Sequence, residues 1–281
     1  MAEEALLDSF IASIDRWKLI DTTSTSGKAT TDAEGFWRLP LTSEALREAP
    51  FETDKTELDR LGKLEASMGL WPREAVLHFY SPSAMILGKL DRRLPQVERA
   101  LEWTEREAVP TVLRIAGGQA VVSDAEVLNI SVLFAEPDQR LSIDDGFRFM
   151  AELIQEAWGL ILEDHFGRRP PELELVIGEV PRSYCPGDYD LSLMGKKVCG
   201  IAQRRVKNAI GVMAYISVGG DQAARCRLVR DYYDEGEADE RFPASDPAVM
   251  TTLDSVVSLT VGDLTERFRS VLGVYLSGAS F

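Results

Sequence analysis

The feature that most limits the fold of this sequence is the apolar run at residues 209–218, AIGVMAYISV. It contains no charged residue, whereas a half-exposed strand alternates apolar and polar side chains. Long apolar runs of this kind are typical of strands that are covered on both faces. We therefore expect residues 209–218 to form a central, buried strand of a sheet.

Other segments indicate further strands and helices around it. Asp54 is a plausible helix cap, and Leu58, Leu61, Leu64 and Met68 share one face of a helix over 54–69. Further helices are expected at 95–107 and 144–160 and in the C-terminal region 254–276, and strands at 75–80, 85–90, 129–134 and 173–180. Residues 6–20 favour a helix, with a strand at 17–21 as the alternative to its end, and the six acids of 231–240 favour a solvated loop. We divide the chain into an N-terminal extension, 1–50, and one domain, 51–281.

Composition limits the possible partners and the cellular compartment. The 281 residues carry a formal net charge of -15, which argues against a nucleic-acid binder because phosphates require a basic face. No apolar run is long enough to span a membrane, and the acidic N-terminus lacks the basic start of a secretion signal. The three cysteines are too few and too widely spaced for a disulfide framework. We expect a soluble, cytoplasmic protein.

A metal site is not expected. The only histidines are His78 and His165, and the sequence has no Cys-x-x-Cys or His-x-x-x-His pair. Both histidines fit structural or solvated positions better than ligand positions.

Cys185 is the candidate nucleophile. It precedes Pro186 and Gly187, so the chain bends there and a thiol in the bend can meet a substrate. A short hairpin would return Lys197 to Cys185, and an ammonium beside a thiol favours the reactive thiolate. Lys197 lies beside an apolar run, where a lysine requires a reason. The alternative is that Cys185 is an inert, packed side chain.

Two adjacent glycines form a second candidate. Gly117 and Gly118 separate the strand-like segments 111–115 and 120–122, which we interpret as a hairpin-like arrangement. Glycine allows positive φ angles and close approach of a ligand to the backbone. The alternative is an ordinary tight turn, and the Gly-Lys-Ser/Thr of a P-loop is missing.

Basic residues gather after the candidate thiol. Between Asp190 and Asp221 the sequence has no acid and five cations, at positions 196, 197, 204, 205 and 207. Such an island could dock an acidic partner, because opposite potentials speed encounter. The alternative is a set of solvated side chains along one edge strand.

Three segments together resemble a known superfamily. RIAGGQAVVSD at 114–124, with LNIS at 128–131, is similar to the Gly-Gly motif of the biotin/lipoate protein ligase (BPL/LPL) superfamily, and KVCGIA at 197–202 to its lysine motif. SYCPGDYDLS at 183–192, with Leu87-Gly88 and DRRLP at 91–95, resembles the branch of octanoyl-[glycine cleavage H protein]:protein N-octanoyltransferases, the lipoyl amidotransferases. The resemblance covers about 55–275. Ser123 stands where many members of the superfamily carry a histidine, a departure that weakens a ligase reading more than an amidotransferase reading.

The resemblance implies an α/β (α+β) fold with a mixed β-sheet flanked by helices, and a fatty-chain tunnel between the Gly-Gly loop and the lysine strand. It implies that Cys185 is the acyl-thioester nucleophile and that Lys197 lowers its pKa. Gly117 and Gly118 would line the tunnel, with Arg114 supporting their loop and Gly200 of the lysine motif also on the substrate side. Cys199 would be a packing residue, and no role is implied for Cys226.

The implied reaction moves an octanoyl group from a lysine of the glycine cleavage H protein, through Cys185, to a lysine of the lipoyl domains of 2-oxoacid dehydrogenase complexes. No cofactor or metal is implied. Three alternatives stay open: an octanoyltransferase that takes its acyl group from acyl carrier protein, an ATP-dependent lipoate or biotin ligase, and a non-catalytic acyl-binding protein.

Overall fold

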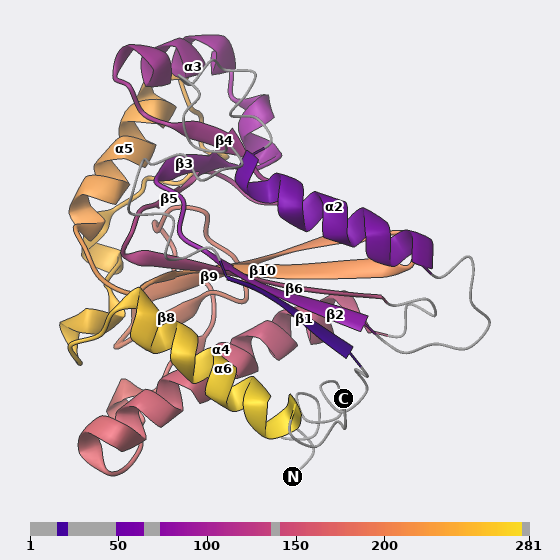
Figure 1. The fold of residues 1–281 in the computed structure, drawn as a ribbon. Helices are drawn as coiled ribbons and strands as arrows, with labels where there is room; N and C mark the ends of the chain where they lie inside the picture. Colours follow the sequence, from indigo (N-terminus) through magenta and orange to yellow (C-terminus); the bar gives the residue numbers. More distant parts are fainter. Residues whose placement is uncertain (1–15, 22–48, 65–73, 136–140, 277–281) are drawn as a thin grey trace.

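The computed structural model describes residues 16–21, 49–64, 74–135 and 141–276. Within these residues, a seven-stranded sheet forms the middle of the fold (Figure 1). Its strand order is β1 (Arg16–Asp21), β2 (Glu74–Tyr80), β6 (Val127–Ala135), β10 (Ala209–Ser217), β9 (Lys196–Val206), β8 (Leu191–Leu193) and β7 (Val176–Ile177). The β1–β2 pair is parallel and the remaining pairs are antiparallel, so the sheet is mixed.

The apolar run at residues 209–218 forms the central strand, β10. All nine residues of β10 are buried, and β6 and β9 pair with its two edges. The prediction of a central, buried strand is confirmed. β10 and the equally buried β6 place the core at the middle of the sheet.

Helices cover both faces of this sheet. α4 (Ile143–Phe166) and α6 (Val261–Leu276) lie against one face, and α2 (Ala49–Leu64) crosses the other (Figure 1). Alternate side chains of one strand join different cores: Leu77 of β2 packs with α4 and α6, whereas Val76 packs with Leu58 of α2. This alternation is the period of two expected of a strand with both faces covered.

A second sheet, of three short strands, lies beside the first (Figure 1). Its order is β4 (Thr111–Leu113), β3 (Ala84–Leu87) and β5 (Val121–Ser123), and it packs with α3 (Val97–Arg106) and α5 (Gln222–Glu235). The hairpin-like pairing expected across Gly117 and Gly118 is wrong. β4 and β5 each pair with β3 rather than with each other, so the glycine loop passes from one edge of the small sheet to the other.

Short 3₁₀ helices connect several of these elements. They are η3 (Leu90–Arg93), η4 (Pro171–Leu173), η5 (Pro247–Val249) and η6 (Leu253–Ser255). The strand expected at 173–180 is reduced to the two residues of β7, because η4 and the turns around it occupy much of the segment. At the N-terminus, residues 16–20 belong to strand β1, so the alternative strand at 17–21 is confirmed; the remainder of the helix expected over 6–20 lies outside the described residues.

Helix α5 was not expected. The Asp221 side chain caps it by accepting from the Ala224 N–H at 2.8 Å, and Cys226, Val229 and Tyr233 are buried along one face. Residues 231–235, which the acidic run assigned to a loop, are its last turn. Their acids point to solvent while the intervening Tyr232 and Tyr233 pack inward, so the acidity marks one face of a helix.

The two histidines occupy the structural and solvated positions that the sequence predicts. His78 is buried on β2, and its Nδ1 lies 2.9 Å from Oδ1 of the buried Asp54, which ties α2 to the sheet. His165 is exposed in the last turn of α4. No helix among the described residues combines the length and the apolar character that crossing a bilayer requires.

Candidate active site

Cys185 lies in the loop between β7 and β8. Its φ is 46°, in the left-handed region that residues with a side chain rarely adopt. Such a conformation costs about 1–3 kcal/mol and persists where the surroundings impose it. The Asp190 carboxylate accepts from the Gly187 N–H at 3.1 Å and closes the turn that follows. The loop therefore holds the thiol half-buried, in a bend, as the sequence predicts.

Two N–H groups are directed at the sulfur of Cys185. The backbone nitrogen of Gln119 lies 3.2 Å from Sγ, and Nη2 of Arg114 lies 3.5 Å from it. Hydrogen bonds and positive charge both favour a thiolate over a thiol. The glycine loop thus supplies the groups that can stabilise an ionised sulfur.

Arg114 also braces the glycine loop. Its Nε donates to the carbonyl of Gly117 at 2.9 Å, and its Nη2 donates to the carbonyl of Gln119 at 2.8 Å. The prediction that Arg114 supports this loop is confirmed. Its contact with Cys185 is an addition that the sequence did not suggest.

Gly118 is the glycine that the site requires. Its φ is 92°, and a Cβ there would lie 2.9 Å from the sulfur of Cys185 and 2.5 Å from Nη2 of Arg114. A side chain would therefore push the loop off the thiol. A Cβ on Gly117 would meet nothing within 4 Å, so only one member of the pair is constrained by close packing.

Lys197 is fully buried, with no exposed surface, at the start of β9. Its Nζ donates to the carbonyl oxygen of Cys185 at 2.7 Å and to that of Tyr184 at 3.0 Å, and it lies 2.8 Å from Oδ2 of Asp190. The chain does return Lys197 to Cys185, but the bond that Nζ makes there is to the backbone carbonyl oxygen and not to the sulfur. These three acceptors match the three protons of an ammonium.

Asp190 is the carboxylate that pairs with the buried Lys197 and offsets the cost of burying its charge. It is 2% exposed, and burial raises its pKa, a rise that Lys197 opposes. An unpaired buried ammonium would cost several kcal/mol, so the pair is needed wherever Lys197 is charged. The sequence offered a signal for this residue: a lysine in an apolar run, seven positions after an acid in a turn.

A small cavity opens beside the thiol. Its volume is about 40 Å³, and Cys185, Arg114 and Tyr215 line it together with Tyr80, Ile86, Val121, Asn129, Gly200, Ile201, Ala202, Met213 and Ala214. Lys197 is not among the lining residues. The cavity is mostly apolar, and residues 200–202 of β9 form part of its lining. The resemblance implies that Gly117 and Gly118 line a fatty-chain tunnel, but neither is among the residues that line this cavity, which touches their loop only through Arg114 and Val121 on either side.

Tyr215 is one of the residues that line this cavity. It is buried, and its hydroxyl has no hydrogen-bond partner among the described residues. Burial raises its pKa well above the ordinary value, so it keeps its proton. A Cβ on Gly200 would lie 2.6 Å from the Tyr215 ring. Gly200 therefore lines the cavity and also leaves the space that the Tyr215 ring occupies.

The other two cysteines are packed. Cys199 on β9 is fully buried, and burial raises its pKa, which keeps it a thiol. Cys226 on α5 is buried against Met250, and burial raises its pKa to about 11. The packing role expected for Cys199 agrees with this arrangement.

The fold and the family comparison define the class. Residues 63–273 match the family described as the lipoyl protein ligase A/B catalytic domain. The crystal structure of lipoate-protein ligase A bound with ATP superposes with a TM-score of 0.60 over 94% of this chain and 86% of that one, at 17% identity. At this identity the superposition shows a shared fold. The predicted BPL/LPL-type fold class, a mixed sheet flanked by helices, is confirmed.

Closer relatives define the branch. An octanoyl-[GcvH]:protein N-octanoyltransferase of Lysinibacillus sphaericus is 33% identical over 230 residues, covering 79% of this chain and 76% of the relative. A protein of the same name from Exiguobacterium sp. is 37% identical over 207 residues, covering 71% and 70%. The chain therefore belongs to the family of octanoyl-[GcvH]:protein N-octanoyltransferases. It is an acyltransferase of protein lipoylation, as the motifs indicated.

Proposed function

We propose that this enzyme moves an octanoyl group from a lysine of the glycine cleavage H protein (GcvH) to a lysine of the lipoyl domains of 2-oxoacid dehydrogenase complexes, through a thioester on Cys185. The observation that carries the proposal is the thiol itself. Cys185 is held in a strained bend at the edge of an apolar cavity, and its sulfur accepts hydrogen bonds from two N–H groups. A covalent intermediate splits the exchange in two, so the two carriers need not occupy the site together.

In the first half-reaction, the Cys185 thiolate attacks the carbonyl carbon of octanoyl-lysine. A C–S bond forms, the C–N bond breaks, and the departing lysine nitrogen takes a proton from the Lys197 ammonium. In the second half, the acceptor lysine returns a proton to Lys197 and attacks the thioester. The C–S bond then breaks, and the thiolate and the ammonium are both restored.

The contacts of Lys197 constrain this proton transfer. All three of its protons are donated within the protein, to Asp190, Tyr184 and Cys185. To reach the substrate nitrogen, Lys197 must exchange one of these bonds, and the bond to the Cys185 carbonyl is the one beside the thiol. Asp190 keeps the amine in place during the exchange.

Tyr215 is a suitable donor to the substrate carbonyl. Acyl transfer develops negative charge on that oxygen, and preorganised donors in a water-poor cavity stabilise it. Tyr215 lines the cavity with Cys185, and its buried hydroxyl lacks a partner among the described residues. Burial keeps it protonated and so able to donate.

The remaining assignments follow from this scheme. No cofactor takes part, because the acyl group arrives already attached to its carrier. A reducing cytoplasm suits the three free thiols. We assign the catalytic domain to residues 51–281 and the extension to 1–50, which contributes β1 to the edge of the large sheet.

A donor comparison tests the function. Purified enzyme and an apo lipoyl domain are incubated with octanoylated GcvH, with octanoyl acyl carrier protein, or with octanoate and ATP, and the acceptor is weighed by mass spectrometry. The proposal expects transfer from octanoylated GcvH to be the fastest. Preferred transfer from acyl carrier protein, release of pyrophosphate with free octanoate, or no transfer from any donor would each favour one of the three alternatives.

A further inference from the structure

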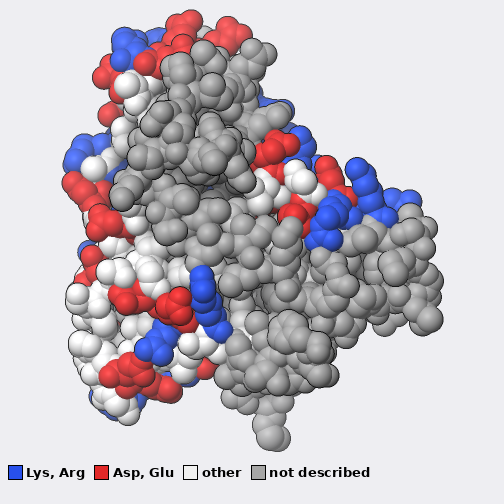
Figure 2. All heavy atoms as spheres, viewed as in Figure 1, with Lys and Arg blue, Asp and Glu red and all other residues white. Residues whose placement is uncertain are grey.

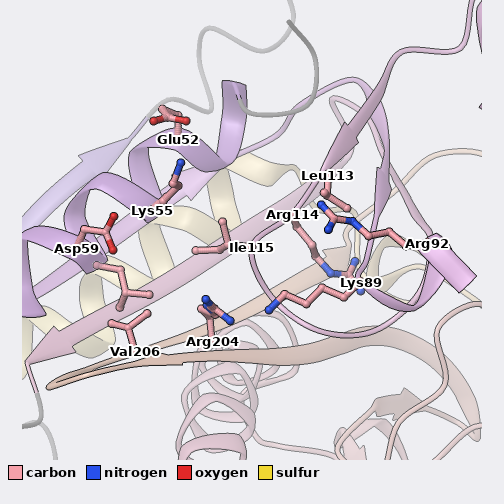
Figure 3. Close-up of a pocket in the computed structure, with 11 residues that line it drawn as sticks. Glu52, Lys55, Asp59, Lys89, Arg92, Leu113, Arg114, Ile115, Arg204 and Val206 are labelled. Atoms are coloured by element: carbon pink, nitrogen blue, oxygen red, sulfur yellow. The ribbon is translucent and has the colours of Figure 1, made fainter. Parts of the chain in front are cut away.

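A second, larger hollow lies beneath α2 (Figure 3). Its volume is about 290 Å³, and five of its lining residues are cations: Lys55 of α2, Lys89, Arg92 of η3, Arg114 and Arg204 of β9. Two acids, Glu52 and Asp59 of α2, are also part of the lining. Figure 3 shows Lys89, Arg114 and Arg204 converging on the hollow from three different segments. We call this hollow the basic pocket.

Four of the five cations of the basic pocket have no anionic partner in the part of the chain that the structure describes. Lys55, Lys89, Arg92 and Arg204 make no ion pair with any of the described residues, whereas neighbouring Arg205 bonds the Leu141 and Ser142 carbonyls next to α4. Partial burial, Arg204 and Arg92 together lower the pKa of Lys89, which shows that the charges repel one another. An anion in the pocket would relieve that repulsion.

The excess of positive charge is local. The whole chain carries a formal net charge of -15, and on the face seen in Figure 2 acidic and basic side chains are interspersed around the α3 end of the molecule. In the basic pocket, five cations stand against two acids. In a protein of net negative charge, such a cluster of cations is not needed for solubility and indicates binding of an acidic partner.

The basic pocket and the thiol cavity share one lining residue. Arg114 lines both, and its guanidinium donates to the sulfur of Cys185. Strand β9 runs from Lys197 past Gly200, Ile201 and Ala202, which line the thiol cavity, to Arg204 and Val206, which line the basic pocket. A protein that presents a lysine arm to Cys185 would rest near these cations.

We propose that the basic pocket is the docking site for an acidic segment of the carrier domains, adjacent to the lysine that gives or receives the acyl group. This inference rests on the proposed function and identifies what that site recognises. The octanoylated lysine is uncharged, so its carrier must be recognised by neighbouring groups. The acceptor lysine arrives as an ammonium, which the pocket would repel unless acidic neighbours compensate for it.

The same charges would assist the second half-reaction. Cations near an incoming lysine disfavour its ammonium form and favour the neutral amine that attacks a thioester. Acidic neighbours of that lysine would form ion pairs with Arg204 and Lys89 and so hold the carrier in place. Because their charge is neutralised in these pairs, they would not favour the ammonium form of the lysine. Docking and activation of the nucleophile would then use one set of side chains.

Charge reversal tests the docking site. The double variant Lys89→Glu/Arg204→Glu is compared with Arg168→Glu, a reversal at an exposed position after α4 and outside the pocket. Affinity for octanoylated GcvH is measured by calorimetry at low and high salt. We expect the double variant to bind at least about tenfold more weakly at low salt, and the control to bind within about twofold of the wild type. The single variant Arg92→Glu, at an exposed position, should show a smaller loss in the same direction.

A neutral acyl donor separates docking from chemistry. Acylation of Cys185 by the octanoyl thioester of N-acetylcysteamine, which has no acidic segment, should stay within about twofold of the wild type in Arg92→Glu and in the double variant. If the wild type accepts an acyl group from neither donor, the proposed function fails, while the binding measurements still decide docking.

Three results would overturn the docking site. One is carrier binding that all the pocket variants leave unchanged. Another is wild-type binding that is indifferent to salt. The third is inorganic phosphate binding tightly in the pocket and depending on Lys89 and Arg204 while carrier binding does not, which would assign the pocket to a free anion instead.

Discussion

At the scale of single residues, the site depends on partners that lie far away in the sequence. The sulfur of Cys185 is contacted by Gln119 and Arg114, some 70 positions earlier, and Lys197 is paired with Asp190. Cys185 and Lys197 were predictable because a thiol in a bend and a lysine in an apolar run are locally unusual. The sulfur's two donors and Tyr215 were not, because only folding brings these residues to the cavity beside the thiol.

Removing the Tyr215 hydroxyl tests its role directly. Tyr215→Phe should lower kcat by about 10- to 100-fold with a small change in KM, because the hydroxyl acts on the developing oxyanion. The same change should leave stability unchanged or raise it by about 1 kcal/mol, since an unpartnered buried group is removed. Transfer kinetics and chemical denaturation measure the two effects.

Tyr232 provides a matched control for that experiment. Its hydroxyl is also buried without a partner among the described residues, but it lies on α5 and does not line the thiol cavity. Tyr232→Phe should reproduce the effect on stability and leave kcat unchanged. If Tyr215→Phe and Tyr232→Phe have the same kcat, the Tyr215 hydroxyl has no role in the mechanism.

Asp190 is expected to be essential for the stability of the site. Asp190→Asn leaves the buried Lys197 without a carboxylate, and breaking a buried pair costs about 3–5 kcal/mol. The change should lower the midpoint of chemical denaturation and also slow transfer. Asp188→Asn, at an exposed position of the same loop, is the control. A stability loss no greater than that of the control would show that the ion pair is dispensable.

At the scale of helices and strands, apolar periodicity identified most of the fold. β2, β6 and β10 and helices α2, α3 and α4 all lie where the pattern placed them, with shifted ends. α5 was missed because charged and apolar residues are interspersed along its 14 residues, and its buried face becomes recognisable only when Asp221 is identified as the helix cap. The prediction of a β4–β5 hairpin was wrong because both strands pair with β3 instead. This pairing depends on tertiary contacts, and the two glycines between β4 and β5 carry no information about it.

The C-terminal end of α4 offers a pH-dependent prediction. Both guanidinium nitrogens Nη1 and Nη2 of Arg169 donate to Glu156 at 2.7 Å, and these bonds hold the pKa of Glu156 below its usual range. A depressed folded-state pKa stabilises the protein above the unfolded-state value of about 4.3, and this contribution is lost as the pH falls through the folded-state pKa.

Glu156→Gln should therefore lower the free energy of unfolding near neutral pH by about 0.5–1 kcal/mol, a small value because the pair is partly exposed. The difference from the wild type should vanish at a pH well below 4.3. Chemical denaturation at both pH values measures it, with Glu172→Gln, at an exposed position, as the control. A constant difference across the pH range would contradict the assignment to this ion pair.

At the scale of the whole molecule, each of the two sheets contributes part of the candidate active site. The large sheet carries Lys197 and Tyr215 on β9 and β10, and the loop after β4 of the small sheet carries Arg114 and Gln119. Cys185, on its own loop, lies where the two meet. The basic pocket opens at the same junction, so a carrier docked there would lie next to the thiol. The sequence motifs identified the enzyme family, but this junction required coordinates.

The thiol cavity of about 40 Å³ holds little more than a water molecule or two, so an octanoyl chain requires its lining to move. Met213 is suited to such movement, because its side chain is long and flexible. Acylation of the enzyme is therefore expected to rearrange the cavity before the second carrier arrives.

The central claim is a thioester on Cys185, and intact-protein mass spectrometry tests it most directly. Wild-type enzyme incubated with octanoylated GcvH, without an acceptor, should gain the mass of one octanoyl group, and digestion should locate that group on Cys185. The adduct should be absent in Cys185→Ala and should disappear from the wild type when an apo lipoyl domain is added. An adduct that persists in Cys185→Ala, or transfer that proceeds in that variant, would contradict the account.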